Sequence, residues 1–510
     1  MREAPESVPE DEREALLTVA HGAVVTSGGV SLRRVLLTAT EFVLTRGLGA
    51  VVYGVYALAW RLAQLLLRFV NFGSVQTLQR YVPAAAGDPG RRGRIAGLAY
   101  ATTLLVGLAV TGVLAVAAAP VNDLTVAHPA FPPALRLFGL MIVLLGVVKI
   151  HAALLRAVGS ARGEVLFNRV LPPAVRLACA TAALALGFSV VGVAGALAAG
   201  TGALALAGLP TVIRATDIRP TLRGVRREAR EFYNHATPIG LSSIGKIFQN
   251  RVDIVLVGLL LTATDAGVYN VVLVLVAIAW IPLKSFNQLL PPVASDLHAA
   301  GETETLNAVY SAVTRLILTT VLPIIAVQVV FGRALLAAFG GTFVAGYPPL
   351  VAYLGGVLVG STVGATGWLL MMTDHQYARM VLDWLLAAGN VALTYLFVVE
   401  FGLVGAALGT AAAIAIQNSI QVVLLRRFEG LWPFDATYLR PVAASLVMAG
   451  AMFVVRAAIG GAAGPLVGVP VGLVVYVGAL LAIGVPARDR LVVRELATRY
   501  RDGVTAAVTG

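Results

Sequence analysis

Charged and amide side chains that could bind a ligand lie inside segments that are otherwise apolar. Two sets recur at helical spacing: Arg61, Gln64, Arg68 and Asn71, and then Ser242, Lys246, Asn250 and Asp253. At about 100° of rotation per residue, each set falls on one face of a helix. Planar guanidinium groups and ammonium groups on such a face suit an anionic ligand, phosphate above all.

Basic residues outnumber acidic ones in these apolar segments. Those far from the predicted helix ends are Arg33, Arg34, Arg61, Arg68, Arg176, Lys246, Arg251 and Arg315. A charge at the centre of a membrane-spanning helix costs about 2.5–3.5 kcal/mol on the insertion scale, which disfavours contact with lipid. We therefore expect a wet, basic cavity whose ligand supplies negative charge, although hydrogen bonding between helices could also explain the polar residues. The substrate-binding candidates are Arg33, Arg34, Arg61, Gln64, Arg68, Asn71, Lys246, Asn250, Arg251 and Lys284.

The acidic residues of the predicted spans are Glu41, Asp253 and Asp383. Glu41 follows Arg34, and Asp253 follows Lys246, by about two helical turns, so each acid shares a helix face with a base. Either these residues pair, or one of the three acids couples transport to a proton or Na⁺ gradient; the membrane potential is a further candidate driving force. No GxxxxGK(S/T) phosphate loop occurs, so ATP is not expected as the direct energy source, and no cofactor is expected.

The elements that must position these side chains are membrane-spanning helices. The chain has 510 residues, of which 58% are hydrophobic and 13% are charged, and its mean hydropathy is +0.85. A soluble protein has about a quarter charged residues. Apolar runs of about twenty residues, the length that crosses a bilayer, recur along the chain and predict about fourteen transmembrane helices. The expected class is an all-α integral membrane protein.

The basic residues outside the spans indicate orientation. Most of them lie in alternate loops and in the tails, and only Arg46, Arg333 and Arg456 lie in the opposite loops. By the positive-inside rule, both termini are expected in the cytoplasm and the chain is expected in the cell membrane. The net charge of +12 is thereby explained without nucleic acid, which is not expected as a partner. Cys179 is the single cysteine, so a cysteine-based metal cluster is excluded.

The chain repeats itself at a shift of about 213 residues. Gly54-Val55-Tyr56 falls on Gly267-Val268-Tyr269, and Val191-Gly192 falls on Val404-Gly405. An even number of predicted spans separates the copies, so both copies cross the membrane in the same direction. The repeat predicts two six-helix lobes and two extra C-terminal helices. The expected divisions are a cytoplasmic N-terminal tail (1–19), an N-lobe (20–213), a basic cytoplasmic linker forming a surface helix (214–235), a C-lobe (236–425), two further spans (436–485) and a cytoplasmic amphipathic tail (486–510).

The openings of the two halves resemble polysaccharide-transporter flippases. The first opening contains Arg34, Glu41, Thr45-Arg46-Gly47-Leu48-Gly49 and Tyr53-Gly54-Val55-Tyr56. The second runs from Pro238 to Pro292 and contains Asp253-Ile254-Val255-Leu256, Gly267-Val268-Tyr269 and Leu290-Pro291-Pro292. The resemblance extends over residues of about 20–425. The family belongs to a superfamily that also holds the multidrug and toxin extrusion antiporters and the lipid II flippase.

The resemblance implies two lobes that open alternately to each membrane face. Their cargo would be an oligosaccharide linked to polyprenyl or dolichyl phosphate, for surface polysaccharide or glycoprotein assembly. Arg34 matches a cavity arginine of the lipid II flippase, whereas Thr40 stands where that protein has a second one, so lipid II is a less favoured cargo. The expected partners are the lipid-linked glycan and membrane lipids, and glycan-assembly enzymes are candidates.

Two other functions compete with the flippase. A multidrug antiporter carries organic cations, which favour an acidic cavity, and its usual twelve spans would leave residues 436–485 unexplained. An integral membrane glycosyltransferase or polymerase needs acidic catalytic residues at a membrane face, whereas the predicted external loops are short and hold only isolated acids: Asp123, Asp265 and Glu400. A transporter, not an enzyme, is expected.

Overall fold

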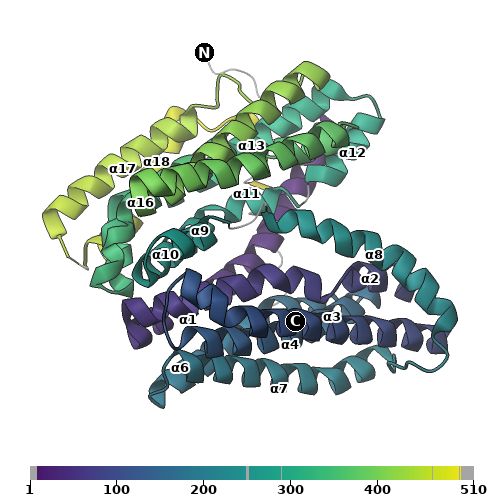
Figure 1. The fold of residues 1–510 in the computed structure, drawn as a ribbon. Helices are drawn as coiled ribbons and strands as arrows, with labels where there is room; N and C mark the ends of the chain where they lie inside the picture. Colours follow the sequence, from purple (N-terminus) through teal and green to yellow (C-terminus); the bar gives the residue numbers. More distant parts are fainter. Residues whose placement is uncertain (1–8, 249–251, 289, 462, 493, 496–510) are drawn as a thin grey trace, which may run out of the picture.

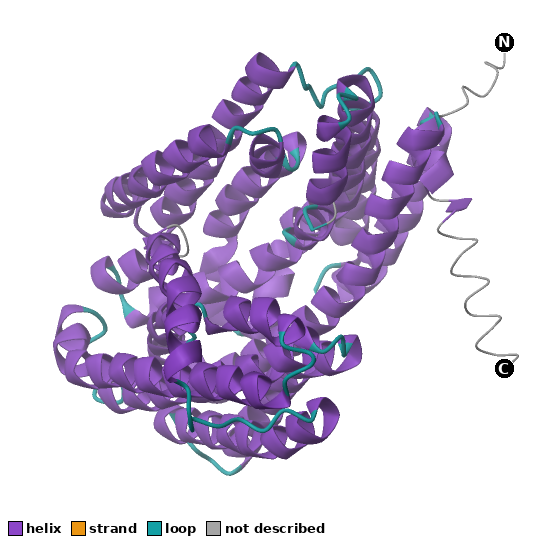
Figure 2. Ribbon diagram, turned by 90° about the vertical axis from the view of Figure 1, so that its right-hand side faces the viewer, coloured by secondary structure: helices purple, strands orange, loops and turns teal. Residues whose placement is uncertain are grey.

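The computed structural model describes residues 9–248, 252–288, 290–461, 463–492 and 494–495. All regular structure in these ranges is helical, which confirms the predicted all-α class (Figure 2). The first half comprises α1 (Glu10–Val70), α2 (Ser74–Ala84), α3 (Pro89–Leu124), α4 (Phe131–Ala157), α5 (Ala161–Val165), the π-helical η1 (Leu166–Val170), α6 (Leu171–Ala185) and α7 (Val190–Thr216).

The second half continues in the same all-helical manner. It comprises α8 (Arg226–Phe248), α9 (Val252–Leu260), α10 (Ala263–Ala279), α11 (Ile281–Phe286), α12 (Leu290–Ala299), α13 (Thr303–Phe339), the 3₁₀ helix η2 (Gly341–Gly346), α14 (Tyr347–Val363), α15 (Thr366–Met372), α16 (Gln376–Glu429), α17 (Arg440–Ile459) and α18 (Ala463–Ile483).

Nine helices of the described part are long and apolar enough to cross a membrane. Two of these helices, α1 and α16, change direction at an internal glycine. Gly49 has φ 73° and Gly402 has φ 56°, a left-handed backbone that glycine adopts far more readily than other residues. Each bent helix covers two of the spans predicted from the sequence. The figure of fourteen spans therefore stays a prediction, and the kinks account for part of its difference from nine.

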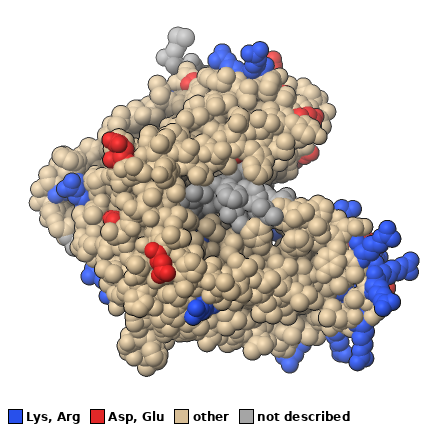
Figure 3. All heavy atoms as spheres, viewed as in Figure 1, with Lys and Arg blue, Asp and Glu red and all other residues tan. Residues whose placement is uncertain are grey.

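The helices form two groups, at the bottom and the top of Figure 1. The group that we call the N-lobe contains α3, α4, α6 and α7, packed around part of α1. The other group, the C-lobe, contains α13, α14, α16, α17 and α18, and α9 and α10 pack against it. The two lobes join where α1 packs against α10. In the space-filling view the surface of both lobes is mostly uncharged, and Lys and Arg gather at one end of the N-lobe (Figure 3).

The lobes touch at the glycines of the repeated motif. A β-carbon on Gly54 would lie 1.8 Å from the carbonyl oxygen of Ala263. A β-carbon on Gly267 would lie 3.2 Å from the α-carbon of Gly54. Backbone therefore packs directly on backbone, and position 54 admits only glycine without displacement of α10. The Gly-Val-Tyr repeat seen in the sequence marks the place where the two halves cross.

The segment between the lobes differs from the expected surface helix. Residues 217–225 are not helical, and α8 begins at Arg226 and continues to Phe248, past the predicted start of the C-lobe at residue 236. Two ion pairs fasten its first turns to α3: Arg91–Glu231 at 2.7 Å and Arg94–Glu228 at 2.7 Å. Because charged side chains of α8 are satisfied by α3, this helix packs on the N-lobe, where it also contacts α2.

The two ends of the described chain lie together (Figure 2). Helix α1 starts at Glu10, within the predicted N-terminal tail, and its Leu16 is buried in the same core as Val492. Two ion pairs join the ends: Arg488–Glu12, and Arg13–Glu495 at 3.4 Å. Residues 487–492 are helical, whereas 496–510 of the predicted tail lie outside the described residues.

Arg315 corrects the predicted set of deep basic residues. Its side chain is 2% exposed and is paired with Asp435 at 2.6 Å and with Asp489 at 2.7 Å. Asp435 precedes α17 and Asp489 follows α18, so both acids lie outside the predicted spans. The prediction that Arg315 is an uncompensated charge is therefore wrong, because its partners come from connecting segments. The pairs also tie the two extra helices to α13.

Candidate functional site

A cavity of about 450 Å³ lies beside α1 and is walled by both lobes. Most of its wall comes from α1, α4 and α6, while Val274 and Lys284 come from α10 and α11. Its charged lining consists of one acid, Glu41, and of six basic residues: Arg33, Arg34, Arg61, Lys149, Arg176 and Lys284. We call this space the basic cavity. Six bases against one acid give this lining an excess of positive charge.

An irregular stretch of the N-lobe forms one wall of the basic cavity. The π-helical turn η1 contributes Phe167 and Asn168, and Pro172 and Pro173 follow in the first turn of α6. A π turn inserts an extra residue into a helix and shifts the side chains that follow it. This stretch places Arg176, one turn after the prolines, against α1.

Glu41 and Arg176 form a buried ion pair inside the N-lobe. Arg176 Nη2 donates to Glu41 Oε1 at 2.9 Å, and both side chains are buried. The hydroxyl of Tyr53 donates to the other carboxylate oxygen at 2.9 Å. The Arg176 guanidinium also lies over the ring of Trp60, 4.7 Å from its centroid. Glu41 thus has its cationic partner on another helix, and the pair cancels one positive charge of the cavity lining.

Hydrogen bonds continue from this pair into the C-lobe. Asn270 of α10 donates to the Tyr53 hydroxyl at 2.6 Å, and Arg61 Nε donates to Asn270 Oδ1 at 2.9 Å. Asn270 is 1% exposed. The series Arg176, Glu41, Tyr53, Asn270 and Arg61, which we call the interlobe network, therefore crosses between the lobes through one buried amide.

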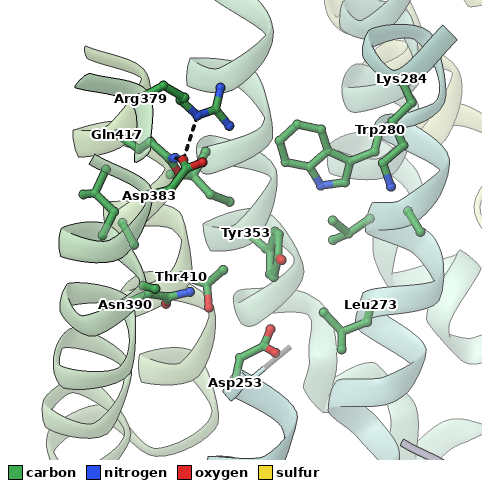
Figure 4. A pocket seen from close by; sticks show the side chains of 16 residues that line it. Asp253, Leu273, Trp280, Lys284, Tyr353, Arg379, Asp383, Asn390, Thr410 and Gln417 are labelled. Atoms are coloured by element: carbon green, nitrogen blue, oxygen red, sulfur yellow. Dashed lines mark hydrogen bonds and ion pairs between the residues drawn. The ribbon is translucent and has the colours of Figure 1, made fainter. Parts of the chain in front are cut away.

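A second cavity, of about 380 Å³, lies in the C-lobe (Figure 4). Its charged lining is balanced between two acids and two bases: Asp253, Asp383, Lys284 and Arg379. Arg379 is paired with Asp383 at 2.8 Å, and Gln417 Nε2 donates to the same carboxylate oxygen at 2.9 Å. Lys284 lines both spaces, so this C-lobe cavity adjoins the basic cavity.

Asp253 lies near the start of α9 at one end of the C-lobe cavity (Figure 4). Its carboxylate accepts hydrogen bonds from the Tyr269 hydroxyl and from the backbone N–H of Ile254, both at 2.9 Å. Tyr269 belongs to the second copy of the repeated motif. The side chain of Lys246, the partner expected from the sequence, lies outside the described residues.

The structure distributes the predicted site residues among three situations. Those that line the basic cavity are Arg33, Arg34, Glu41, Arg61, Gln64 and Lys284. Those that line the C-lobe cavity are Asp253, Asp383 and again Lys284. Asn71 lines neither cavity: it donates to Thr103 Oγ1 at 3.2 Å and to the carbonyl of Gly146 at 3.0 Å. The remaining candidates lie outside the described residues: Asn250, Arg251 and the side chains of Arg68 and Lys246. Asn71 thus joins helices, as in the alternative explanation of the polar residues.

Several residues of the site were absent from the predicted substrate-binding set. Arg176 stood among the deep basic residues but was not selected, and Lys149 was not among the candidates. The signal for Asn270 was available, because it directly follows the repeated Gly-Val-Tyr motif. Arg379 precedes Asp383 by one helical turn, a spacing that favours a pair.

Solved membrane transporters share this two-lobed fold. The chain matches a solved structure of the lipid II flippase MurJ in an inward closed conformation, with a TM-score of 0.70 and 14% identity over 89% of this chain and 98% of that one. A multidrug resistance MATE family transporter in an inward-facing conformation matches with a TM-score of 0.62 and 17% identity over 81% and 98% of the two chains. A transporter of the MOP superfamily from Pyrococcus furiosus has a TM-score of 0.54 and 15% identity, over 83% and 99%. These matches show a shared fold.

The family follows from the sequence. A model of the polysaccharide biosynthesis protein family matches residues 43–342, and the chain belongs to this family. A curated relative, the probable low-salt glycan biosynthesis flippase of Haloferax volcanii, is 23% identical over 236 residues, which are 46% of this chain and 50% of the relative. The chain thus spans about half the length of that relative. Together these findings confirm the resemblance to polysaccharide transporters and the expectation of a multi-pass membrane transporter.

Proposed function

We propose that the protein is a flippase for an oligosaccharide linked to polyprenyl or dolichyl phosphate. The observation that carries this proposal is the basic cavity, where six basic side chains accompany a single acid. One of the six, Arg176, is paired with that acid, and the positive excess of the others suits phosphate oxygens. The name of the Haloferax volcanii relative, a flippase of glycan biosynthesis, supports the same class of cargo.

Contacts at one end of the lobes support alternating access. Arg46 donates to the carbonyl of Ala338 at 2.8 Å, and the rings of Phe42 and Phe339 lie 5.8 Å apart. The positive-inside rule places Arg46 outside the cell, so these contacts would close the outer end while the basic cavity faces the cytoplasm. Their separation would open the cavity to the outside and release the headgroup there.

We assign the coupling role to Asp253. Glu41 and Asp383 each have an arginine partner, whereas the hydrogen bonds given to Asp253 by described residues come from neutral groups. A carboxylate that accepts hydrogen bonds from neutral groups can exchange a proton or hold Na⁺. The driving force would then be a proton or Na⁺ gradient, assisted by the membrane potential.

The same proposal sets the cellular context. A cytoplasmic location of both termini and insertion in the cell membrane follow from the charge asymmetry of the loops. Enzymes that assemble the glycan on its lipid would supply the substrate on the cytoplasmic side. Enzymes that transfer or polymerise the glycan would use it outside, for surface polysaccharide or glycoprotein.

Deletion of the gene tests this function. The glycan-carrying lipid should accumulate on the cytoplasmic leaflet and surface glycan should be lost, without hypersensitivity to cationic drugs. The multidrug antiporter is the second candidate, because solved transporters of that class share the fold. Normal surface glycan together with sensitivity to cationic dyes would establish the antiporter instead.

Point variants connect that phenotype to the basic cavity. Arg34→Ala and Arg61→Ala, which each remove one cationic lining group, should fail to restore surface glycan at normal expression. Arg136→Ala is the matched control, since Arg136 is exposed and lines neither cavity. Full restoration by both cavity variants would show that the basic residues serve packing alone.

A further inference from the structure

We propose that the C-lobe cavity is a saccharide subsite in which Trp280 is the stacking platform. This inference rests on the proposed flippase function and concerns the part of the ligand that the basic cavity does not hold. Trp280 stands between α10 and α11, and its ring points into the cavity toward Tyr353 (Figure 4). An indole face packs well against the apolar C–H face of a sugar ring, and ligand pockets use few such aromatic walls.

The fold gives the Trp280 ring a defined position. A β-carbon on Gly360 of α14 would lie 3.2 Å from the Cη2 atom of that ring. The indole edge therefore rests on a part of α14 that carries no side chain. The ring is held at its edge and is only partly buried, which leaves surface available to a ligand.

The opposite wall supplies hydrogen-bonding groups of the kind that sugar hydroxyls need. Arg379, Asp383 and Gln417 form one cluster across the cavity from Trp280 (Figure 4). The first two come from the part of α16 before its bend at Gly402, and Gln417 comes from the part after it. Planar amide, carboxylate and guanidinium groups offer donors and acceptors in fixed directions, as hydroxyl recognition requires.

The charge balance of the C-lobe cavity favours a neutral polar ligand. Its two acids and two bases compensate one another, in contrast to the excess of positive charge in the basic cavity. A phosphate would gain little here relative to the neighbouring space. A sugar, which carries hydroxyl groups and no net charge, would not disturb the balance.

Thr410 gives an independent sign of a ligand. Its side chain lines the C-lobe cavity, is 6% exposed, and its hydroxyl oxygen has no hydrogen-bond partner among the described residues. A buried hydroxyl is normally satisfied, and a ligand in this cavity would be one source of a partner for it. In Figure 4 Thr410 lies beside Asn390, on the same side of the cavity as the polar cluster.

Lys284 explains how one ligand can occupy both cavities. Its side chain lines both spaces, so a phosphate beside Lys284 would lie at the border between them. The first sugars attached to that phosphate would then extend into the C-lobe cavity. A volume of about 380 Å³ is within the usual range for small-molecule pockets.

Binding of two lipids to the purified full-length protein tests the subsite. The probes are the host's polyprenyl or dolichyl phosphate without sugar, and the glycan-carrying lipid that accumulates in the deletion strain. Trp280→Ala should weaken binding of the glycan-carrying lipid by about tenfold. Binding of the lipid phosphate without sugar should stay within about twofold. Trp280→Phe, which keeps an aromatic face, should fall between. Trp384→Ala is the matched control, because Trp384 is exposed and lines neither cavity.

The outcomes separate the two proposals. An unchanged ratio of the two affinities in Trp280→Ala would overturn the saccharide subsite while leaving the flippase intact. If no glycan-carrying lipid accumulates after deletion, the proposed function fails first, and the subsite fails with it.

Discussion

Asn270 of α10 donates a hydrogen bond to the Tyr53 hydroxyl of α1 at 2.6 Å, across the boundary between the two lobes. The same amide accepts a hydrogen bond from Arg61, a residue that lines the basic cavity. An anion bound by Arg61 would compete with the Asn270 carbonyl for the guanidinium. We therefore expect ligand binding in the basic cavity to act directly on a C-lobe side chain.

Replacement of this amide should uncouple binding from transport. Asn270→Ala removes the acceptor of Arg61 and the donor to Tyr53, and it leaves the Tyr53–Glu41 hydrogen bond in place. We expect transport to fall by about tenfold, while the free energy of unfolding falls by about 1–3 kcal/mol. Transport in proteoliposomes and unfolding in detergent measure the two effects. Asn418→Ala, which removes an amide that is hydrogen-bonded within α16, is the control. Equal losses of transport in the two variants would contradict the coupling role of Asn270.

The buried pair of Glu41 and Arg176 predicts a stability cycle. Arg176→Met leaves a buried carboxylate without its cation and should cost about 3–5 kcal/mol of unfolding free energy. The double variant Glu41→Leu/Arg176→Met should regain most of this loss, because an apolar pair needs no charge compensation. Denaturant unfolding of the single and double variants measures the cycle. Additive losses would show that the two side chains act independently.

A cross-link at the outer contact should stop transport. Cysteines at positions 42 and 339, on a Cys179→Ser background, replace two rings whose centroids are 5.8 Å apart. A short thiol cross-linker should join them and hold the outer end closed, whereas each single cysteine should leave transport unchanged. If a reducible cross-linker is used, transport should return when reduction cleaves it, which would identify the closure as the cause. Unimpaired transport by the cross-linked protein would refute the outer gate.

Asp253→Asn should remove the response to a gradient without removing ligand binding. The amide keeps an acceptor for the Tyr269 hydroxyl and loses the charge that would exchange a proton or hold Na⁺. Transport in proteoliposomes should no longer increase when a pH or Na⁺ gradient is imposed. Asp383→Asn, which breaks an ion pair with Arg379 instead, should keep that response. The reverse pattern would transfer the coupling role to Asp383.

The predicted orientation can be tested by labelling. Single cysteines replacing Arg219 and Asp123, again without Cys179, occupy segments predicted inside and outside the cell. A membrane-impermeant thiol reagent added to intact cells should reach position 123 only. Labelling of position 219 from outside would invert the topology and, with it, the direction in which the cavity opens.

The sequence was most informative where a pattern reflected a direct physical requirement. The repeated Gly-Val-Tyr motif predicted two related halves, and the structure shows why its glycines recur, since Gly54 and Gly267 are where backbone meets backbone. Helical spacing also grouped Arg61 with Gln64, which are hydrogen-bonded at 2.9 Å beside the basic cavity. Local spacing of this kind is visible without knowledge of the tertiary fold.

Pairing across distant segments could not be predicted in the same way. Arg315 is neutralised by Asp435 and Asp489, which are more than a hundred residues away and lie outside the spans in which acids were sought. Asn71 has the spacing of a cavity residue but points to Thr103 of α3. Which face of a helix meets another helix depends on packing that a single helical wheel does not contain.

The crossing of Gly54 and Gly267 has a mechanical consequence. Because backbone meets backbone at this contact, it can serve as a fulcrum for a small change in crossing angle. From Gly267 to Trp280, α10 extends about 20 Å at 1.5 Å per residue. A tilt of roughly 15° would therefore move Trp280 by about 5 Å while barely shifting the glycines. In such a tilt the helix would act as a lever, with its long arm at the two cavities.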